Sequence, residues 1–486
     1  MRLIIRYSCL LFVLGTIASC KKYLDVNTNP NQPTKPTING LLTRVTQNAA
    51  LNVYRVSTGV TSYYVQYLSS SNAASPTDTY DDIDVSTTWT SLYDNMTDIY
   101  DLQKIAVERG APHYQGVANI LMAMDLSLVH MLWGDAPFTS AFSAESLSPE
   151  YDDAQSIYDK CLSLLDEAIT LLGQAGGSVM IPTAGSNNPD LIHKGKITAW
   201  VKTAHAMKAR LLLLVSETGE YNSAAILTEL AAAYTSTADD AFITTFDVRN
   251  PWNQVALNNQ NLLLDGWLSE QFIDAMNGDT YGIFDPRLPR LTDATKFGDY
   301  RGTPNGKGRT GSGVNFEETY VNLTGYYSSS NSPLFIITYE ELKFIEAEVK
   351  FRASDLPGAY TAYLEGITAS MNKIGVSPAD RDDYITDASV SVGSANITMD
   401  LIMKEKYKAL YLSPETWNDA RRYNYQYEDF TLPLNAVTAD YIRRLVYPSV
   451  ETSRNGVNVP PVTGVLEKMW WDQRSEEHTS ELQSPI

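Results

Sequence analysis

Cysteine is scarce in this chain, and the few cysteines present do not provide an internal disulfide. Cys9, Cys20 and Cys161 are the only three among 486 residues, and the first two fall in an N-terminal leader. An exported body that keeps Cys161 alone must be stable through its core. Cys161 lies in a helical pattern, which favours a buried, inert thiol over a nucleophile.

Motifs that mark common enzyme classes are missing too. The five histidines show no HExxH spacing, and the chain has neither a GxSxG nucleophile elbow nor a P-loop. The glycine-rich stretch 302–313 lacks the GxxxxGK(S/T) order and is interpreted as a mobile loop. Glycoside hydrolysis needs two carboxylates at a set separation, and no motif singles out such a pair. We therefore expect no catalytic activity and no built-in zinc site.

Positive charge and long hydrophobic runs are also in short supply. Lys and Arg number 37 against 57 Asp and Glu, which gives a formal net charge of −20 at pH 7. Such a surface repels nucleic acid, so we expect no nucleic-acid partner. After the leader, no apolar run approaches the length that spans a membrane. The composition indicates a soluble body.

The leader predicts export and lipid anchoring. Arg2 and Arg6 give a positive start, residues 10–14 form a short apolar run, and residues 17–20 read Ile-Ala-Ser-Cys. This pattern predicts a lipoprotein signal peptide over 1–19 and lipidation of Cys20. A polar tether over 20–36 would then hold the body at a membrane surface. An ordinary secretory signal with an incidental cysteine is the alternative.

The other end of the chain differs from the body. Residues 474–486 form a polar string without periodicity, and the string closely resembles the translation of a sequencing-library adapter. We therefore interpret it as an artefact and leave it out of fold reasoning. The remainder predicts a single domain over 37–473.

Helical periodicity dominates that body. In residues 197–214 the apolar side chains return every three or four positions, while Lys and Arg lie mostly off the stripe. The sequences YDKCLSLLDEAITLL and YTAYLEGITASM have the Tyr, Leu and Ala spacing of tetratricopeptide helices, although the repeat is degenerate. We predict a mainly α fold of tetratricopeptide-like hairpins, with helices over 114–132, 152–172, 197–214, 339–351, 359–373 and 399–411.

Two stretches interrupt the helical pattern and are the expected place of a ligand. Residues 69–88 form a polar loop, and residues 247–333 are mostly irregular and rich in Gly and aromatics. Long irregular segments of ordered proteins usually carry function. Sugar or peptide binding needs flat aromatic faces beside polar groups. The candidate ligand-binding residues, each with packing as the alternative, are Tyr80, Trp252, Tyr300, Arg301, Tyr326 and Tyr327; Trp252 is expected outside any helix.

A group of carboxylates in the first loop suggests a weak metal candidate. Asp78, Asp81, Asp82 and Asp84 supply the oxygen ligands that Ca²⁺ prefers. Their spacing is not that of an EF-hand, and a solvated acidic loop is the favoured interpretation. We expect no other cofactor.

Several motifs together resemble the SusD/RagB family of nutrient-binding outer-membrane lipoproteins from Bacteroidota, and its SusD-like subgroup in particular. They run in order through nearly the whole chain. The start CKKYLDVNTNPNQPT and the helix–loop–helix opening HMLWGDAPFTSAFS are followed by AWVKTAHAMKARLLL, DPRLPRL, SPLFIITYEELKFIEAEV, LEGITASMNKIGV, ETWNDARRYNY and RRLVYPSVETSRNG.

The resemblance implies a helical scaffold with an irregular ligand-binding face. It also implies a partner, a SusC-like TonB-dependent transporter, for which the lipoprotein acts as a lid that delivers oligosaccharide or peptide. The implied location is the outer membrane, lipid-anchored and facing the exterior, although Lys21 and Lys22 stand where surface lipoproteins often carry acidic residues. The alternatives are a surface glycan-degrading enzyme and a helical adaptor that binds no nutrient.

Overall fold

The computed structural model describes residues 36–143, 146–185, 187–261, 266–310 and 316–473. Cys20, the predicted signal peptide over 1–19, the tether up to residue 35 and the tail 474–486 lie outside the described residues. Within them the fold is helical and carries two small sheets, so the predicted mainly α class is confirmed.

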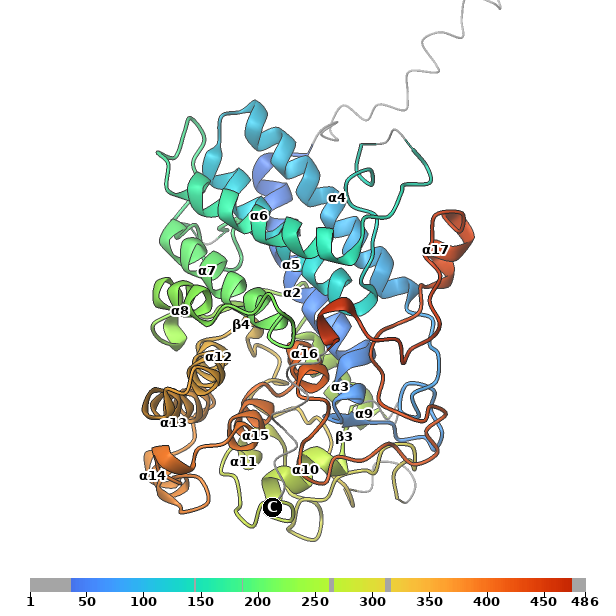
Figure 1. Ribbon diagram of the computed structural model, residues 1–486, viewed down its shortest axis with the longest axis vertical. Helices are drawn as coiled ribbons and strands as arrows, with labels where there is room; N and C mark the ends of the chain where they lie inside the picture. Colours follow the sequence, from blue (N-terminus) through green and yellow to red (C-terminus); the bar gives the residue numbers. More distant parts are fainter. Residues whose placement is uncertain (1–35, 144–145, 186, 262–265, 311–315, 474–486) are drawn as a thin grey trace, which may run out of the picture.

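The N-terminal half of the described chain builds the upper layer of helices in Figure 1. Consecutive helices pack against one another in pairs, α4 on α5, α5 on α6 and α7 on α8, while α2 crosses α4 and α5. Such pairing of sequence neighbours is the arrangement of helical repeats. The helices are α2 (Ile38–Val56), α3 (Ser62–Tyr64), α4 (Ser86–Glu108), α5 (Pro112–Trp133), α6 (Ala154–Leu172), α7 (Ile197–Leu214) and α8 (Ser223–Ala232), with the π-helix η2 (Ser57–Thr61) between α2 and α3.

The C-terminal half continues the scaffold with a second group of helices at the lower left of Figure 1. Helix α12 pairs with α13 and also contacts α7, α8 and α15. The predicted helices agree with the observed ones within a few residues at each end. This group consists of α12 (Tyr339–Arg352), α13 (Leu356–Lys373), α14 (Pro378–Thr386), α15 (Met399–Ala409) and α16 (Glu415–Arg422), and α17 (Ser449–Arg454) lies apart from it.

Short elements separate the two groups of helices. The strands β1 and β3 pair antiparallel through Leu68 and Leu268, and β2 and β4 pair antiparallel through Ala241 and Ile337. The segment 247–333 is less irregular than the sequence predicted, because it holds three short helices. Its elements and neighbours are β1 (Leu68–Ser69), β2 (Ala241–Ile243), α9 (Pro251–Gln260), β3 (Trp267–Leu268), α10 (Glu270–Asn277), α11 (Leu288–Leu291) and β4 (Leu334–Ile337), with 3-10 turns η3 (Thr237–Asp239), η4 (Ser394–Asn396) and η5 (Trp470–Asp472).

Helix α5 corrects one expectation from the sequence. Over its 22 residues it is long and apolar enough to cross a membrane, so an apolar run of membrane-spanning length does exist after the leader. Within the fold, 94% of its most apolar window is buried, because α2, α4, α6 and α7 surround it. The helix is therefore the central core helix of this half of the protein.

The buried carboxyl of Asp125 on α5 ties three helices together. Asn52 Nδ2 on α2 and Asn95 Nδ2 on α4 both donate to Asp125 Oδ2, at 3.2 and 2.7 Å. Burial raises the pKa of Asp125 to about 7, although these hydrogen bonds and the nearby Arg55 act in the opposite direction. The folded protein therefore keeps this proton over a pH range in which the unfolded chain has lost it.

We expect Asp125→Asn to stabilise the protein increasingly as pH rises from 4 to about 7. A raised folded-state pKa means that the wild type loses stability with rising pH in this window, and the neutral amide is free of that penalty. Urea unfolding of both proteins at several pH values measures the difference. A stability difference that does not change with pH would contradict the prediction.

Candidate functional site

The loop-rich segment around α10 and α11 lies at one end of the molecule, at the bottom of Figure 1. Its glycine-rich part was expected to be mobile, but the structure shows that residues 302–309 are pinned. Asn305 Nδ2 and the Gly306 amide donate to Asp78, at 2.5 and 2.6 Å. Gly306 and Gly308 have positive φ and face the backbone of Leu434 and Ala73 too closely for a Cβ. Close packing, and not mobility, explains these glycines.

Three phenylalanines of this segment stand out from the surface. Phe284, Phe297 and Phe316 are 46%, 56% and 52% exposed, whereas most other aromatic rings of the described chain are buried or half-buried. A large apolar ring in water costs free energy unless a partner covers it. Such rings are the usual means of contact with flat sugar faces or apolar side chains.

These phenylalanines and Tyr300 lie on stretches of chain that contact one another, and we call the four residues the aromatic face: Phe284, Phe297, Tyr300 and Phe316. The rings of Phe284 and Tyr300 lie with centroids 6.0 Å apart. The Lys296 amide donates to the carbonyl of Phe316 at 2.8 Å, so the chain segments that carry Phe297 and Phe316 lie side by side. Behind them, Tyr320 joins Phe316 to the buried Trp267, with centroid distances of 5.9 and 5.2 Å.

Charged side chains border the aromatic face. The guanidinium carbon of Arg301 lies 4.5 Å from the centroid of Phe297, a cation–π contact, and its Nε and Nη2 donate to Asp299 at 2.8 and 2.6 Å. Lys296 pairs with Glu317 at 2.5 Å. The hydrogen bonds from Arg301 and Thr295 lower the pKa of Asp299. The face thus combines exposed rings with ionised groups that can hydrogen-bond hydroxyls.

The structure places two of the predicted residues, Tyr300 and Arg301, on this face. Tyr80 is a correction, because it is 1% exposed and its hydroxyl donates to the Tyr64 carbonyl at 3.1 Å. Trp252 is corrected in the same way, because it is 3% exposed and lies near the start of α9, within a helix. Its ring meets Tyr54 edge-on at 4.9 Å. Both side chains are core.

Tyr326 and Tyr327 point to different cavities. Tyr327 and Trp252 line an interior cavity of about 50 Å³, far below the roughly 300 Å³ of a small-molecule pocket. Tyr326 lines an open groove of about 530 Å³ together with Arg290. Of the two tyrosines, only Tyr326 is therefore placed to meet a ligand.

The four loop aspartates do not gather around a common point. Asp78 is buried, and besides Asn305 and Gly306 it accepts from Ser69 Oγ at 3.1 Å. Asp84 accepts from Ser86 and Ser449 and joins the start of α4 to that of α17. In the described part of the chain, no group of three or more His, Cys, Asp or Glu side chains is arranged to hold a metal ion.

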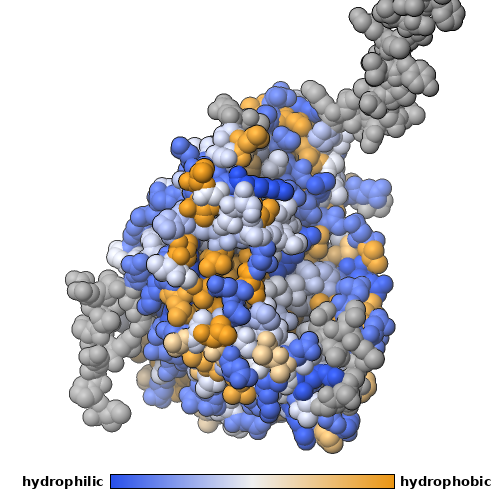
Figure 2. All heavy atoms as spheres, turned by 90° about the vertical axis from the view of Figure 1, so that its right-hand side faces the viewer, coloured by the Kyte–Doolittle hydropathy of each residue, from blue (hydrophilic) through white to orange (hydrophobic). Residues whose placement is uncertain are grey.

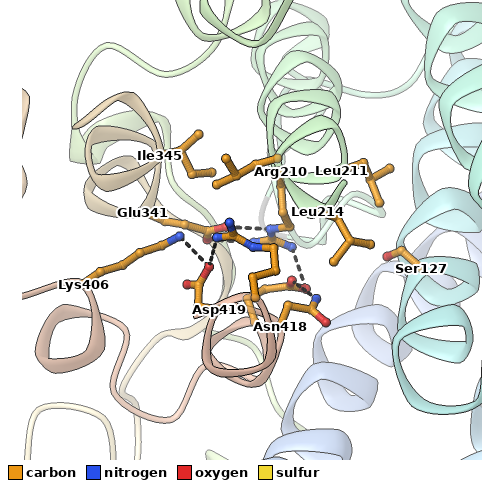
Figure 3. Close-up of a pocket in the computed structure, with 12 residues that line it drawn as sticks. Ser127, Arg210, Leu211, Leu214, Glu341, Ile345, Lys406, Asn418 and Asp419 are labelled. Carbon is orange, nitrogen blue, oxygen red and sulfur yellow. Dashed lines mark hydrogen bonds and ion pairs between the residues drawn. The ribbon is translucent and has the colours of Figure 1, made fainter. Parts of the chain in front are cut away.

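A buried charge network occupies the interior between α7, α12, α15 and α16 (Figure 3). Arg210 Nε and Nη2 donate to Glu341 at 2.6 and 2.8 Å, and Lys406 Nζ donates to Asp419 at 2.8 Å. The space between them measures about 30 Å³, which is room for one water. Neighbouring cations neutralise these carboxylates, so the network joins scaffold helices.

The sequence around the three phenylalanines contains a signal for a functional surface. Phe284 and Phe297 stand in stretches with Gly and Asp, and Phe316 follows a Gly-rich stretch, all without helical or strand periodicity. An apolar ring without a periodic core pattern around it is a candidate for a functional surface. The three phenylalanines are not among the residues expected from the sequence, which are tyrosines, a tryptophan and an arginine.

A comparison with protein-family models found a match that covers most of the chain. Residues 30–448 match the SusD-like family model described as "Starch-binding associating with outer membrane". The chain belongs to the SusD-like family. The predicted resemblance is therefore confirmed over nearly the whole described body. No curated protein sequence matches this SusD-like chain.

Solved structures confirm that this SusD-like protein has the family's fold. A chitin-binding protein superimposes with a TM-score of 0.74 at 22% identity, covering 90% of this chain and 100% of its own. A chitin-binding SusD homologue from Flavobacterium johnsoniae gives 0.74 at 20% identity, covering 90% and 99%. A SusD homologue from Bacteroides fragilis gives 0.73 at 19% identity, covering 91% and 100%.

Proposed function

We propose that this SusD-like protein captures oligosaccharides at the cell surface and passes them, uncleaved, to a SusC-like TonB-dependent transporter. The observation that carries the proposal is the aromatic face, where Phe284, Phe297 and Phe316 are about half exposed and the Lys296 amide donates to the Phe316 carbonyl. Rigid, exposed rings beside polar groups suit sugar rings, which offer an apolar face and a rim of hydroxyls. The chitin-binding relatives support oligosaccharide over peptide as the ligand class.

A binding role without catalysis agrees with the charges beside the face. A glycosidase needs one carboxylic acid with a raised pKa to protonate the leaving group. Asp299 has a lowered pKa, because Arg301 and Thr295 stabilise its ionised form. The carboxylate at the edge of the rings therefore accepts hydrogen bonds and does not supply a proton.

The anchoring and the partner form the second part of the proposal. Lipidation of Cys20 would hold the body at the outer membrane, in agreement with the family's association with that membrane. Figure 2 shows apolar side chains gathered in the middle of one face of the molecule, surrounded by hydrophilic ones. An apolar surface of this kind favours contact with a protein partner over exposure to water.

Calorimetric titration tests the proposal with the full-chain protein in mild detergent. The titrants are neutral oligosaccharides, including chitin and starch fragments, and peptides, and each mixture is afterwards analysed for cleavage. We expect saturable heat with an oligosaccharide that is recovered intact. Cleaved oligosaccharide would instead establish the glycan-degrading enzyme, and the absence of binding by every titrant would favour the adaptor.

A further inference from the structure

A second surface feature lies apart from the aromatic face, between α11 and the chain that leads into β4. It is a groove of about 530 Å³, lined by Pro289, Arg290, Thr324, Tyr326, Ser329, Ser330, Asn331, Ser332 and Pro333. These lining residues include one cation and no carboxylate. The chain has a net charge of −20, so a groove whose lining carries a positive charge and no negative one is an exception to the overall charge.

The groove presents several hydrogen-bond donors that have no partner among the residues that the structure describes. Arg290 Nε donates to the Ile374 carbonyl at 3.0 Å, and among the described residues the guanidinium makes no ion pair. Within the same part of the chain, the Tyr326 hydroxyl, the Ser330 hydroxyl and the Asn331 side-chain amide make no hydrogen bond. An arginine with both Nη groups free can bind the two oxygens of a carboxylate or sulfate side by side.

The backbone that carries these donors is held firmly. The Tyr326 amide donates to the Arg290 carbonyl at 2.8 Å, which fixes one wall of the groove against the other. Asn250 holds the far wall, because its amide donates to the Ser330 carbonyl at 3.0 Å and its Nδ2 to the Ser332 carbonyl at 2.8 Å. Donors fixed before binding lose less entropy when a ligand arrives.

Arg290 differs from Arg301 of the aromatic face in its charge pairing. Arg301 is already neutralised by Asp299, whereas Arg290 makes no ion pair among the described residues, and Asp293 at one end of its groove accepts from Thr324 Oγ1 at 3.5 Å. The protein's negative charge repels acidic ligands over long distances. An acidic group therefore needs a local, unpaired cation of the Arg290 kind to be held at the surface.

We propose that the Arg290 groove is a subsite for an acidic group on the bound oligosaccharide, either a sugar carboxylate or a sulfate ester. This inference rests on the proposed function, because it assumes that the ligand is a sugar chain. Arg290 binds the anion, and Tyr326, Ser330 and Asn331 donate to its oxygens or to neighbouring hydroxyls. The groove would thereby select acidic oligosaccharides over neutral ones.

Titration of the full-chain protein with matched pairs of sugars tests the subsite. The pairs are an oligogalacturonate and its methyl ester, and a sulfated galactan oligosaccharide and its desulfated form. We expect the acidic member of one pair to bind more tightly at low salt and to lose this advantage as salt increases. Which pair shows the difference distinguishes a carboxylate from a sulfate ligand.

Variants connect that preference to the groove. We expect Arg290→Gln to weaken acidic-sugar binding roughly ten- to hundredfold and to leave neutral-sugar binding unchanged. Arg290→Lys should retain part of the preference, since it keeps the charge without the fork. Asn331→Ala, at an exposed position outside the fold's core, tests the groove without touching the arginine. Arg109→Gln, at the exposed end of α4, is the matched control.

The outcomes separate the two proposals. Equal affinity for acidic and neutral members of both pairs, or an acidic preference that Arg290→Gln does not change, would overturn the subsite. If neutral sugars still bind the wild type and Phe297→Ala weakens that binding, the proposed function survives the failure of the subsite. If no sugar, neutral or acidic, bound to the protein, both the subsite and the proposed function would be overturned.

Discussion

We expect Arg287→Ala to lower the free energy of unfolding by about 3–5 kcal/mol, because it removes one partner from a buried charge cluster. Arg287 is 1% exposed, and its guanidinium donates to Asp285 at 2.9 and 2.6 Å and to Glu405 at 2.6 Å. Lys408 is the second cation of the cluster. Without Arg287, the two buried carboxylates would lose their nearest cation and keep only Lys408 and the more distant Lys404, 3.8 Å from Glu405.

The chain offers a matched control for this experiment. Asp299 and Arg301 have the same Asp-x-Arg spacing as Asp285 and Arg287, but they are 45% and 52% exposed. Because solvent screens an exposed pair, we expect Arg301→Ala to change stability by less than about 1 kcal/mol. Urea unfolding of both variants measures the difference. Equal losses in the two variants would contradict the argument that burial decides the cost.

The Arg287 cluster also explains how the loop-rich end is attached to the scaffold. Glu405 belongs to α15, whereas Arg287 immediately precedes α11. The Tyr384 hydroxyl, near the end of α14, donates to the same glutamate at 2.8 Å. Arg287→Ala should therefore loosen α11, and with it the groove that Arg290 lines, before it affects the distant helices α4 to α6.

Much of the scaffold was predictable from sequence because the helices are amphipathic on their own. In α7 the stripe that includes Trp200, Met207 and Leu211 is buried, and the observed bounds Ile197–Leu214 are those of the pattern. In α6, Asp153 caps the helix by accepting from the Ser156 amide at 3.0 Å. Local periodicity and local caps are sufficient to define such elements.

The site was predictable only in part, because burial in loops depends on distant residues. Tyr80 stands in a polar stretch, yet its ring packs edge-on against Tyr64, and the carbonyl of the neighbouring Thr79 accepts from the Val437 amide, far along the chain. Trp252 follows a proline in a polar stretch, yet Tyr54 of α2 covers its ring. Composition around a residue does not reveal such partners, and it does not show that Tyr300 stays half-buried and Arg301 exposed.

We expect the double variant Phe297→Ala, Tyr300→Ala to weaken oligosaccharide binding roughly 30- to 100-fold, since truncation of each contact ring costs about 1–1.5 kcal/mol. Both side chains belong to the aromatic face; Phe297 is 56% exposed, whereas Tyr300 is half-buried, so most of the packing that is lost comes from Tyr300. Calorimetric titration with the best neutral sugar measures the loss, and thermal unfolding checks that the protein stays folded.

Variants that keep an aromatic ring decide whether the flat faces of these side chains cause the oligosaccharide binding. Phe297→Tyr and Tyr300→Phe each preserve a six-membered ring and change only the hydroxyl, so we expect them to bind within a few-fold of the wild type if stacking dominates. Phe297→Leu keeps apolar area but loses the flat ring. Wild-type affinity in Phe297→Leu would show that hydrophobic area alone is sufficient. Wild-type affinity in the double alanine variant would remove the aromatic face from the binding site altogether.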